Sequence, residues 1–395
     1  LLALAPAGAA AAEEAWRYVV PPPGDPFEHP PLRALALSSE KPEDVVEKVA
    51  YRGQKRRYAQ LRYGSPNSVR VTVVLDESGP GAVDLYVDAN RNRRIEDRDK
   101  VEPSADRRTW RLPLNLAIVK GETTSYEPRA VVFRRGATGL TFSFAAAGYL
   151  AGRVRLDGRE HAARRVDGDG NGLLTDPQDR LWIDLDDDGR WDPATEQFLY
   201  TPILAVGGQR YAVRSDTLGH RLELAALKGT GAMRLALKRP AAAKVAEISA
   251  LLVGCDGSAI SLSGEGETIV PIGEYRLEMV SIVLDDPSGG PRWSFVFSDR
   301  GGRRGEPVWR PVGPGATLAL DPIGPLELHT GLSPDATARP GDLVECRPQL
   351  YTGDGLLIVT AGRGTATAST EGPTAAIALE TSDGHRLASA RSGFA

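Results

Sequence analysis

The sequence predicts a mainly β protein made of tandem antiparallel β-sandwich modules, with acidic loops inserted between strands. Three observations predict this class. Short segments in which apolar and polar residues alternate recur from Arg57 onward. Turns rich in Gly, Pro, Ser and Asp separate these segments. Three Asp-rich stretches with a common spacing fall between such segments, so we expect them to connect strands.

The chain is long enough for several modules. At 395 residues it accommodates two to four domains with cores of their own. We expect six segments: a signal-peptide remnant (1–12), a proline-rich linker (13–34), a β-module with a degenerate acidic loop (35–139), a β-module with two acidic loops (140–228), a β-sandwich module (229–330) and a C-terminal β-module (331–395).

The first residues are typical of the end of a secretory signal peptide. Leu1 to Ala12 is an apolar run, and the alanines at 10–12 satisfy the small-x-small cleavage rule. The alternative is an alanine-rich core helix. No other stretch approaches the roughly eighteen apolar residues of a membrane span. We therefore expect a secreted, periplasmic or cell-surface protein without a membrane span.

Charge and motif content exclude several functions. The net charge of −4, without a long basic run, gives no support for nucleic-acid binding. The five histidines show no metal or catalytic spacing, and no G-x-S-x-G motif occurs, so we name no catalytic residue. Cys255 and Cys346 either pair in an oxidising compartment or stay as two free thiols.

The elements of the first half follow from local periodicity. Lys41 to Tyr51 carries valines at helical spacing and predicts one short helix. From Arg57, the segments RRYAQLRYG, SVRVTVVLDE and AVDLYVDA alternate apolar and polar residues and predict strands. A second cycle begins near Leu140 and repeats the order strand, turn, strand, acidic loop, strand. Two related β-modules are the simplest interpretation.

Downstream of Lys228 the acidic loops stop. Short predicted strands recur there every eight to twelve residues, which is typical of an all-β sandwich. The segment VPIGEYRLEMVSIVL resembles the strands of prealbumin-like and carboxypeptidase-regulatory-like modules, in which P-x-G-x-Y leads into a long strand. This resemblance implies modules of an Ig-like or prealbumin-like type.

The three Asp-rich stretches are the most informative feature for chemistry. We name them the Asp88 loop (88–99), the Asp167 loop (167–179) and the Asp184 loop (184–196). Each places side-chain oxygens at positions 1, 3 and 5, a backbone carbonyl at position 7 and a closing carboxylate at position 12 or 13. The expected ligands are Asp184, Asp186, Asp188, the Arg190 carbonyl and Glu196; Asp167, Asp169, Asn171, the Leu173 carbonyl and Asp179; and Asp88, Asn90, Asn92, the Arg94 carbonyl and Asp99.

This spacing suits calcium, which takes six to eight oxygen ligands at about 2.3–2.6 Å. Residues 167–196 hold nine Asp and one Glu against two Arg, a local charge of −8. Only a bound cation or full solvation relieves such repulsion. The alternative is that these stretches are solvated Asp/Gly turns.

The Asp88 loop is the weakest copy. Only one of its first three ligand positions carries a charge, and four arginines lie within its twelve residues. Arg93 stands where Gly172 and Gly189 provide the bend in the other two loops. Since ligand charge sets affinity in such loops, we expect the Asp88 loop to bind calcium poorly or not at all.

The loops resemble the calcium loops of EF-hands and of dockerin-type repeats, over about a tenth of the chain. The flanks differ from those families. Pro177 and Pro193 fall where an exit helix would begin, and residues 180–183 alternate like a strand. We therefore expect loops on β-structure, which disfavours a dockerin-like assembly partner.

The combined expectation is a secreted or cell-surface calcium-binding structural or binding protein, in which calcium acts as a structural staple. The alternative is a calcium-dependent carbohydrate-binding or carbohydrate-active protein, since six tryptophans could offer a sugar-stacking face. Calcium is the expected cofactor, and a polysaccharide or a cell-surface protein is the expected class of further partner.

Overall fold

The computed structural model describes residues 16–22, 30–64, 69–79, 82–120, 123–136, 141–238, 244–299, 302–330, 348–363, 374–381 and 383–393. Within these ranges the regular structure is almost entirely β-strand, and no α-helix occurs. A 3-10 turn, η1 (Asp97–Asp99), lies in the Asp88 loop. The prediction of a mainly β chain with several antiparallel sheets is therefore confirmed.

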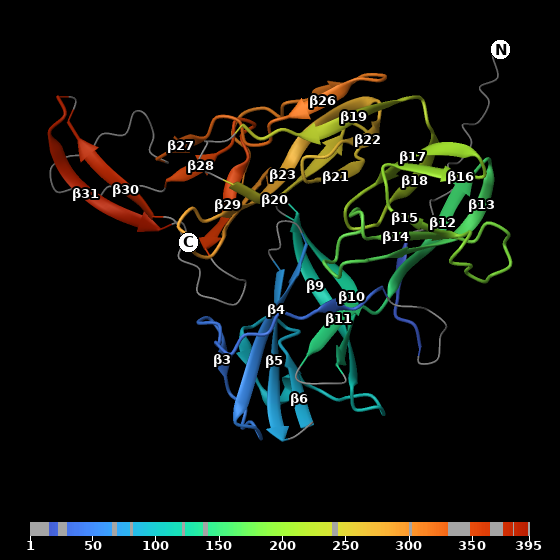
Figure 1. Cartoon of the computed structure of the whole chain (residues 1–395), viewed down its shortest axis with the longest axis horizontal. Helices are drawn as coiled ribbons and strands as arrows, with labels where there is room; N and C mark the ends of the chain where they lie inside the picture. Colours follow the sequence, from blue (N-terminus) through green and yellow to red (C-terminus); the bar gives the residue numbers. More distant parts are fainter. Residues whose placement is uncertain are drawn as a thin grey trace, which may run out of the picture.

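Two four-stranded sheets, drawn in blue and teal in Figure 1, share the first core. Their orders are β4-β5-β6-β8 and β2-β11-β10-β9, and all their pairings are antiparallel. The strands are β4 (Lys55–Tyr63), β5 (Val69–Gly79), β6 (Ala82–Val87), β8 (Lys100–Val101), β2 (Arg33–Ala34), β9 (Thr109–Lys120), β10 (Thr123–Arg135) and β11 (Phe142–Ala146). We call these two sheets the first sheet pair.

Alternation along the strands explains this core. Val71, Val73 and Leu75 of β5 lie on one face and are fully buried. Trp110 and Phe133 from the facing sheet are equally buried. Removing this apolar surface from water is the main term that holds the two sheets together.

A second sheet pair, drawn in green apart from the blue β1, contains two of the three acidic loops (Figure 1). One sheet has the order β1-β12-β13-β14-β15 and the other β16-β17-β18, and their apolar residues form one cluster. The strands are β1 (Arg17–Val19), β12 (Tyr149–Leu156), β13 (Arg159–Val166), β14 (Arg180–Ile183), β15 (Gln197–Leu199), β16 (Ile203–Val206), β17 (Gln209–Ser215) and β18 (Leu222–Ala226).

The third sheet pair follows in yellow to red (Figure 1). An eight-stranded sheet has the order β21-β20-β23-β24-β29-β28-β27 with β25 on β23, and a small sheet has the order β22-β19-β26. The strands are β19 (Thr230–Leu235), β20 (Lys244–Gly254), β21 (Ala259–Ser263), β22 (Thr268–Pro271), β23 (Gly273–Asp285), β24 (Trp293–Ser298), β25 (Arg310–Val312), β26 (Thr317–Leu320), β27 (Glu327–His329), β28 (Gln349–Tyr351) and β29 (Leu357–Arg363). A separate ladder joins β30 (Thr374–Glu380) to β31 (Arg386–Gly393).

The predicted helix at Lys41 to Tyr51 is wrong. This stretch is extended and contains β3 (Val46–Glu47), which pairs in parallel with β7 (Arg94–Ile95). The Val46 and Lys48 amides donate to carbonyls of the Asp88 loop, at 2.9 and 2.8 Å. Hydrogen bonds to a distant segment replace those of a helix turn, so tertiary pairing overrides the local spacing.

The strand pairings do not by themselves divide the chain into domains, so the predicted boundaries stay predictions. Residues 1–12 lie outside the described residues, and the described parts of 13–34 form β1 and β2. Cys255 is an exposed free thiol, whereas Cys346 lies outside the described residues. Among the described residues, no helix is long and apolar enough to cross a membrane.

Candidate metal centre

Each acidic loop connects two antiparallel neighbours in a sheet. The Asp88 loop joins β6 to β8, the Asp167 loop joins β13 to β14, and the Asp184 loop joins β14 to β15. In every copy, position 1 is the first residue after a strand. The flanks are therefore strands, and the likeness to EF-hand and dockerin loops ends at the loops themselves.

The three loops share one backbone conformation. Positions 4 and 6 have positive φ in all of them: Arg91 57°, Arg93 59°, Gly170 73°, Gly172 80°, Asp187 60° and Gly189 74°. These two left-handed residues turn successive amides towards the centre of the loop. The Asp88 loop makes both bends without glycine, at a cost of about 1–2 kcal/mol for each residue.

The ligand positions also share their hydrogen bonds. The carboxylate at position 1 accepts from the amides at positions 5 and 6, as Asp184 does from Asp188 and Gly189 at 3.1 and 3.0 Å. The side chain at position 5 accepts from the amide at position 7, as Asn171 does from Leu173 at 2.7 Å. The other copies repeat these bonds at Asp167, Asp188, Asp88 and Asn92.

The closing carboxylates fold back over the loops. Glu196 accepts from the amides of Leu185 and Asp192 at 2.7 and 2.9 Å. Asp179 accepts from those of Gly168 and Asp176 at 2.9 and 2.7 Å, and Asp99 from Glu96 at 2.8 Å. In the Asp167 and Asp184 loops the closing carboxylate thus accepts from the amide at position 2, whereas in the Asp88 loop it accepts only within the last turn.

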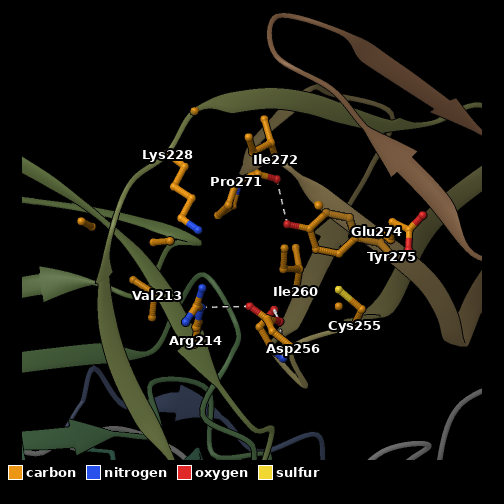
Figure 2. Close-up of a pocket in the computed structure, with 16 residues that line it drawn as sticks. Val213, Arg214, Lys228, Cys255, Asp256, Ile260, Pro271, Ile272, Glu274 and Tyr275 are labelled. Carbon is orange, nitrogen blue, oxygen red and sulfur yellow. Dashed lines mark hydrogen bonds and ion pairs between the residues drawn. The ribbon is translucent and has the colours of Figure 1, made fainter.

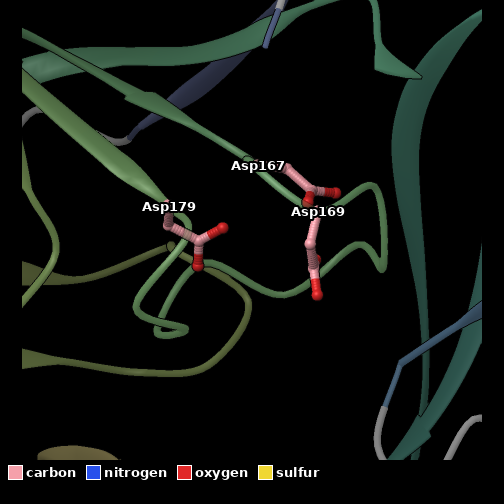
Figure 3. Close-up of side chains that lie close together, drawn as sticks. All are labelled: Asp167, Asp169 and Asp179. Carbon is pink, nitrogen blue, oxygen red and sulfur yellow. The ribbon is translucent and has the colours of Figure 1, made fainter. Parts of the chain in front are cut away.

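Two groups of carboxylates come together closely enough to hold a metal ion. Asp167, Asp169 and Asp179 each offer an oxygen, and these oxygens lie within 4.8 Å of one another. Asp184, Asp186 and Asp188 form a second group, from positions 1, 3 and 5 of their loop, and the predicted closing residue Glu196 is not part of it. Figure 3 shows Asp179 reaching from the far end of its loop towards Asp167 and Asp169. The Asp88 loop has only two carboxylates among its expected ligands, Asp88 and Asp99, and no group of three is found there within the described residues.

Two observations in the Asp167 loop indicate unfilled ligand capacity. The carbonyl of Leu173, at position 7, accepts no hydrogen bond from any described residue, although Leu173 is buried. The hydroxyl of Thr175, at position 9, is buried and likewise has no partner among the described residues. Buried polar groups are normally paired, so both are available to a ligand.

The Asp167 loop is the more buried of the two groups. Asp167 and Asp179 are 5% and 1% exposed, and burial raises the pKa of both. Burial, followed by the charges of Asp167 and Asp176, raises the pKa of Asp169 to about 7. In the Asp184 loop, Asp186 and Asp188 are exposed, whereas Asp184 and Glu196 are buried. A cation would relieve the larger electrostatic cost in the Asp167 loop.

Buried side chains that the sequence analysis did not single out hold the loops in place. Arg165 of β13 donates to the Leu174 carbonyl at 2.6 Å, the Ser215 hydroxyl at 2.7 Å and the Arg221 carbonyl at 3.2 Å. His161 lies beside the Asp184 loop, with Nδ1 3.0 Å from the Asp184 carbonyl. Neither residue belongs to a motif, so nothing in the local pattern could have identified them.

A cavity of about 200 Å³ lies where the second sheet pair meets the third (Figure 2). Its polar walls are paired internally. Arg214 contacts Asp256 at 2.9 Å, the Ser258 hydroxyl donates to Asp256 at 2.6 Å, and the Tyr275 hydroxyl donates to the Pro271 carbonyl at 2.8 Å. None of its lining side chains has a buried polar atom without a hydrogen bond, so the cavity is a weaker candidate than the acidic loops.

Comparisons of the chain with known protein families, curated proteins and solved structures found no match. The arrangement of carboxylates in the Asp167 and Asp184 loops is therefore the basis for a functional assignment.

Proposed function

We propose that this chain is a secreted or cell-surface calcium-binding structural or binding protein, built from Ig-like or prealbumin-like β-sandwich modules and stapled by calcium. The observation that carries the proposal is the pair of three-carboxylate groups in the Asp167 and Asp184 loops. All candidate ligands are hard oxygens, with neither sulfur nor imidazole among them. Carboxylates combined with a backbone carbonyl suit calcium, while magnesium keeps several waters and demands octahedral geometry.

Calcium would act here on stability and would take no part in a reaction. Each loop joins neighbouring strands, so a cation that fixes the loop also fixes their pairing. An ion that binds only the folded state stabilises it by mass action, by about 2.7 kcal/mol at one hundred times the dissociation constant. With the dissociation constants of about 0.1–1 mM typical of extracellular modules, about 1 mM calcium would contribute about 0.4–1.4 kcal/mol per site.

The alternative prediction, a carbohydrate-binding or carbohydrate-active protein, gains no specific support. Of the six tryptophans, all within the described residues, only Trp309 is exposed, at 40%. Trp110 is fully buried in the first core.

Isothermal titration of calcium into chelator-stripped protein tests the proposal. We expect at least one site and a rise in melting temperature. Substituting Asp169→Ala and Asp186→Ala together should abolish the heat, because each loop loses its carboxylate at position 3. A parallel titration with magnesium should give much weaker binding. The absence of both a heat signal and a melting shift at millimolar calcium would refute the proposal.

A further inference from the structure

The Asp167 loop differs from the Asp184 loop in what it touches. Its strands, β13 and β14, belong to the second sheet pair. Its tip, however, packs into the first sheet pair: Leu173 belongs to the first core, together with residues such as Tyr63 and Leu116. Gly172 is so close that a Cβ there would lie 3.2 Å from the Tyr63 ring. The loop therefore lies between two cores.

Polar contacts fix the same tip to the first sheet pair. The Gly64 amide, directly after β4, donates to the Asn171 carbonyl at 2.8 Å. Arg129 of β10, a buried side chain, donates to the Gly172 carbonyl at 3.0 Å. Arg33 of β2 donates to the Asp169 carbonyl at 2.8 Å and lies 3.5 Å from its carboxylate. We call residues 171–173 the docking tip.

The docking tip is the same part of the loop that the ligand residues shape. Asp167 accepts hydrogen bonds from the amides of Asn171 and Gly172, and Asn171 accepts one from Leu173. Asn171 and Leu173 are themselves expected ligands, through a side chain and a carbonyl. A cation that draws these groups together therefore also sets the positions of the carbonyls that Gly64 and Arg129 recognise.

The Asp184 loop provides an internal comparison. Its described contacts stay within the second sheet pair: the Asp184 amide bonds the Ala162 carbonyl at 3.0 Å, Asp187 pairs with Arg159 at 3.0 Å, and Leu185 packs against the core of that pair. It carries the same number of clustered carboxylates as the Asp167 loop. The two loops thus have similar sets of carboxylates, but one loop lies between two cores and the other lies within one sheet pair.

We propose that a cation in the Asp167 loop locks the second sheet pair onto the first, whereas the Asp184 loop is a staple within the second pair alone. This rests on the proposed calcium binding. Without the cation, three clustered carboxylates repel one another and the docking tip loses its fixed shape. Other contacts across this joint, such as the Ala130 amide to the Tyr18 hydroxyl at 2.9 Å, do not involve the loop. Calcium removal therefore loosens the joint without separating the two parts.

Hydrogen exchange on the full chain, read by mass spectrometry with and without calcium, tests the joint. The reporter is the peptide that contains Gly64, whose amide bonds the docking tip from outside the loop. We expect calcium to slow its exchange at least about tenfold, while the amides in the centre of β5 stay protected in both conditions. Asp169→Ala should abolish this effect, and Asp186→Ala, at the same position of the other loop, should leave it intact.

The outcomes separate the joint from calcium binding itself. If titration shows binding but calcium leaves Gly64 exchange unchanged, the joint is refuted and the binding proposal stands. If Asp186→Ala removes the protection as fully as Asp169→Ala, calcium acts globally and the joint is again refuted. Absence of any calcium heat refutes the binding proposal first.

A reciprocal measurement provides a second check. If docking of the tip and calcium binding are coupled, calcium strengthens docking by the same factor by which docking raises calcium affinity. A variant that weakens the docking contacts must therefore lower the calcium affinity. Leu173→Ala retains the carbonyl and all side-chain ligands but removes apolar contact with the first core. We expect about a fivefold or greater loss of affinity at the Asp167 loop. Leu199→Ala removes the same side-chain atoms from an exposed leucine of β15 outside the loops and should change neither affinity. Unchanged affinity in a folded Leu173→Ala protein would refute the coupling.

Discussion

At the scale of single residues, the Asp88 loop has the same two left-handed positions as the other loops but carries fewer carboxylates among its expected ligands. Its two left-handed positions are arginines, and both side chains have partners elsewhere. Arg91 donates to the Asn115 carbonyl at 2.7 Å, and Arg93 pairs with Asp44 at 2.8 Å. Backbone amides donate to the buried Asp88 carboxylate, as they do to Asp167 and Asp184. The Asp88 loop therefore has the hydrogen bonds of the other two loops, but no group of three carboxylates is found there among the described residues.

Asp88→Ala should therefore lower stability without changing the calcium titration. It removes the Asp88 acceptor of the Arg93 amide and one of the two acceptors of the Asn92 amide, and because both residues are exposed we expect a loss of about 0.5–1.5 kcal/mol for each hydrogen bond. Asp184→Ala should instead reduce the calcium heat. Titration and thermal melting of both variants check this. Equal losses of calcium binding in the two variants would show that the ranking of the loops is wrong.

The raised pKa of Asp169 leads to a second prediction. Calcium-free folded protein holds this proton up to a pKa of about 7, whereas the unfolded chain releases it near the ordinary value of 3.8. The folded state thus binds more protons between these values, and stability must fall as pH rises towards 7. With a chelator present, wild type should lose melting temperature relative to Asp169→Asn over this range.

Saturating calcium should reverse that trend, because the ion requires the deprotonated carboxylate. A difference between wild type and Asp169→Asn that does not vary with pH in chelator would contradict the prediction.

At the scale of elements, β13 organises both candidate sites. It ends at Val166, directly before Asp167, and its neighbour β14 lies between the two loops. Its Arg165 is fully buried, and burial lowers the pKa of the guanidinium. Its hydrogen bonds join the Asp167 loop to the turn between β17 and β18. Strand β13 therefore positions the first residue of the Asp167 loop, and its Arg165 holds the same loop at Leu174.

Arg165→Met should destabilise the calcium-free protein by about 3 kcal/mol, since two carbonyls and a hydroxyl lose a charged donor inside the protein. Arg155→Met is the matched control. Arg155 lies on the adjacent strand β12, and its pair with Glu160 is exposed, so about 0–1 kcal/mol is expected. Denaturant unfolding measures both. Similar losses in the two variants would disprove the anchoring role of Arg165.

At the scale of the whole molecule, His220 and Glu127 connect the second sheet pair to the first. His220 Nε2 lies 2.8 Å from the buried Glu127 carboxylate. The hydrogen bond with Glu127 raises the pKa of His220 above 6.5. Burial opposes the charge on Glu127, but hydrogen bonds from His220 and Ser125 outweigh it and lower the pKa below 4.5. The pair is thus charged over a window around pH 5–6.

The sign of each shift sets the pH profile. The His220 contribution is complete below pH 6.5 and disappears as pH rises through its raised pKa, whereas that of Glu127 disappears as pH falls through its lowered pKa. The melting temperature of wild type should therefore exceed that of His220→Gln by the largest amount at pH 5–6. This difference in melting temperature should disappear at alkaline pH. Melting curves across this range measure it. A gap that persists undiminished at pH 9 would rule out an ionic role.

The local sequence pattern was sufficient to predict many of the strands and loops of this protein. The alternation of Val71, Val73 and Leu75 acts between neighbouring residues, so it identifies a strand without reference to the fold. The D-x-D-x-D spacing similarly acts within thirteen residues, which is why the three loops and their strand flanks could be predicted. The extended stretch at Val46 could not be predicted from local pattern, because its hydrogen bonds go to the distant Asp88 loop.

The sequence by itself determined the β character of the chain and the position of the three acidic loops between strands. Only the tertiary structure decided which loop lies between two cores. Gly64, Arg129 and Leu218 reach the Asp167 loop or its neighbourhood from distant parts of the chain. The physical reason is range: turn chemistry is set by a few adjacent residues, whereas burial and the partners of a buried charge depend on how the sheets pack.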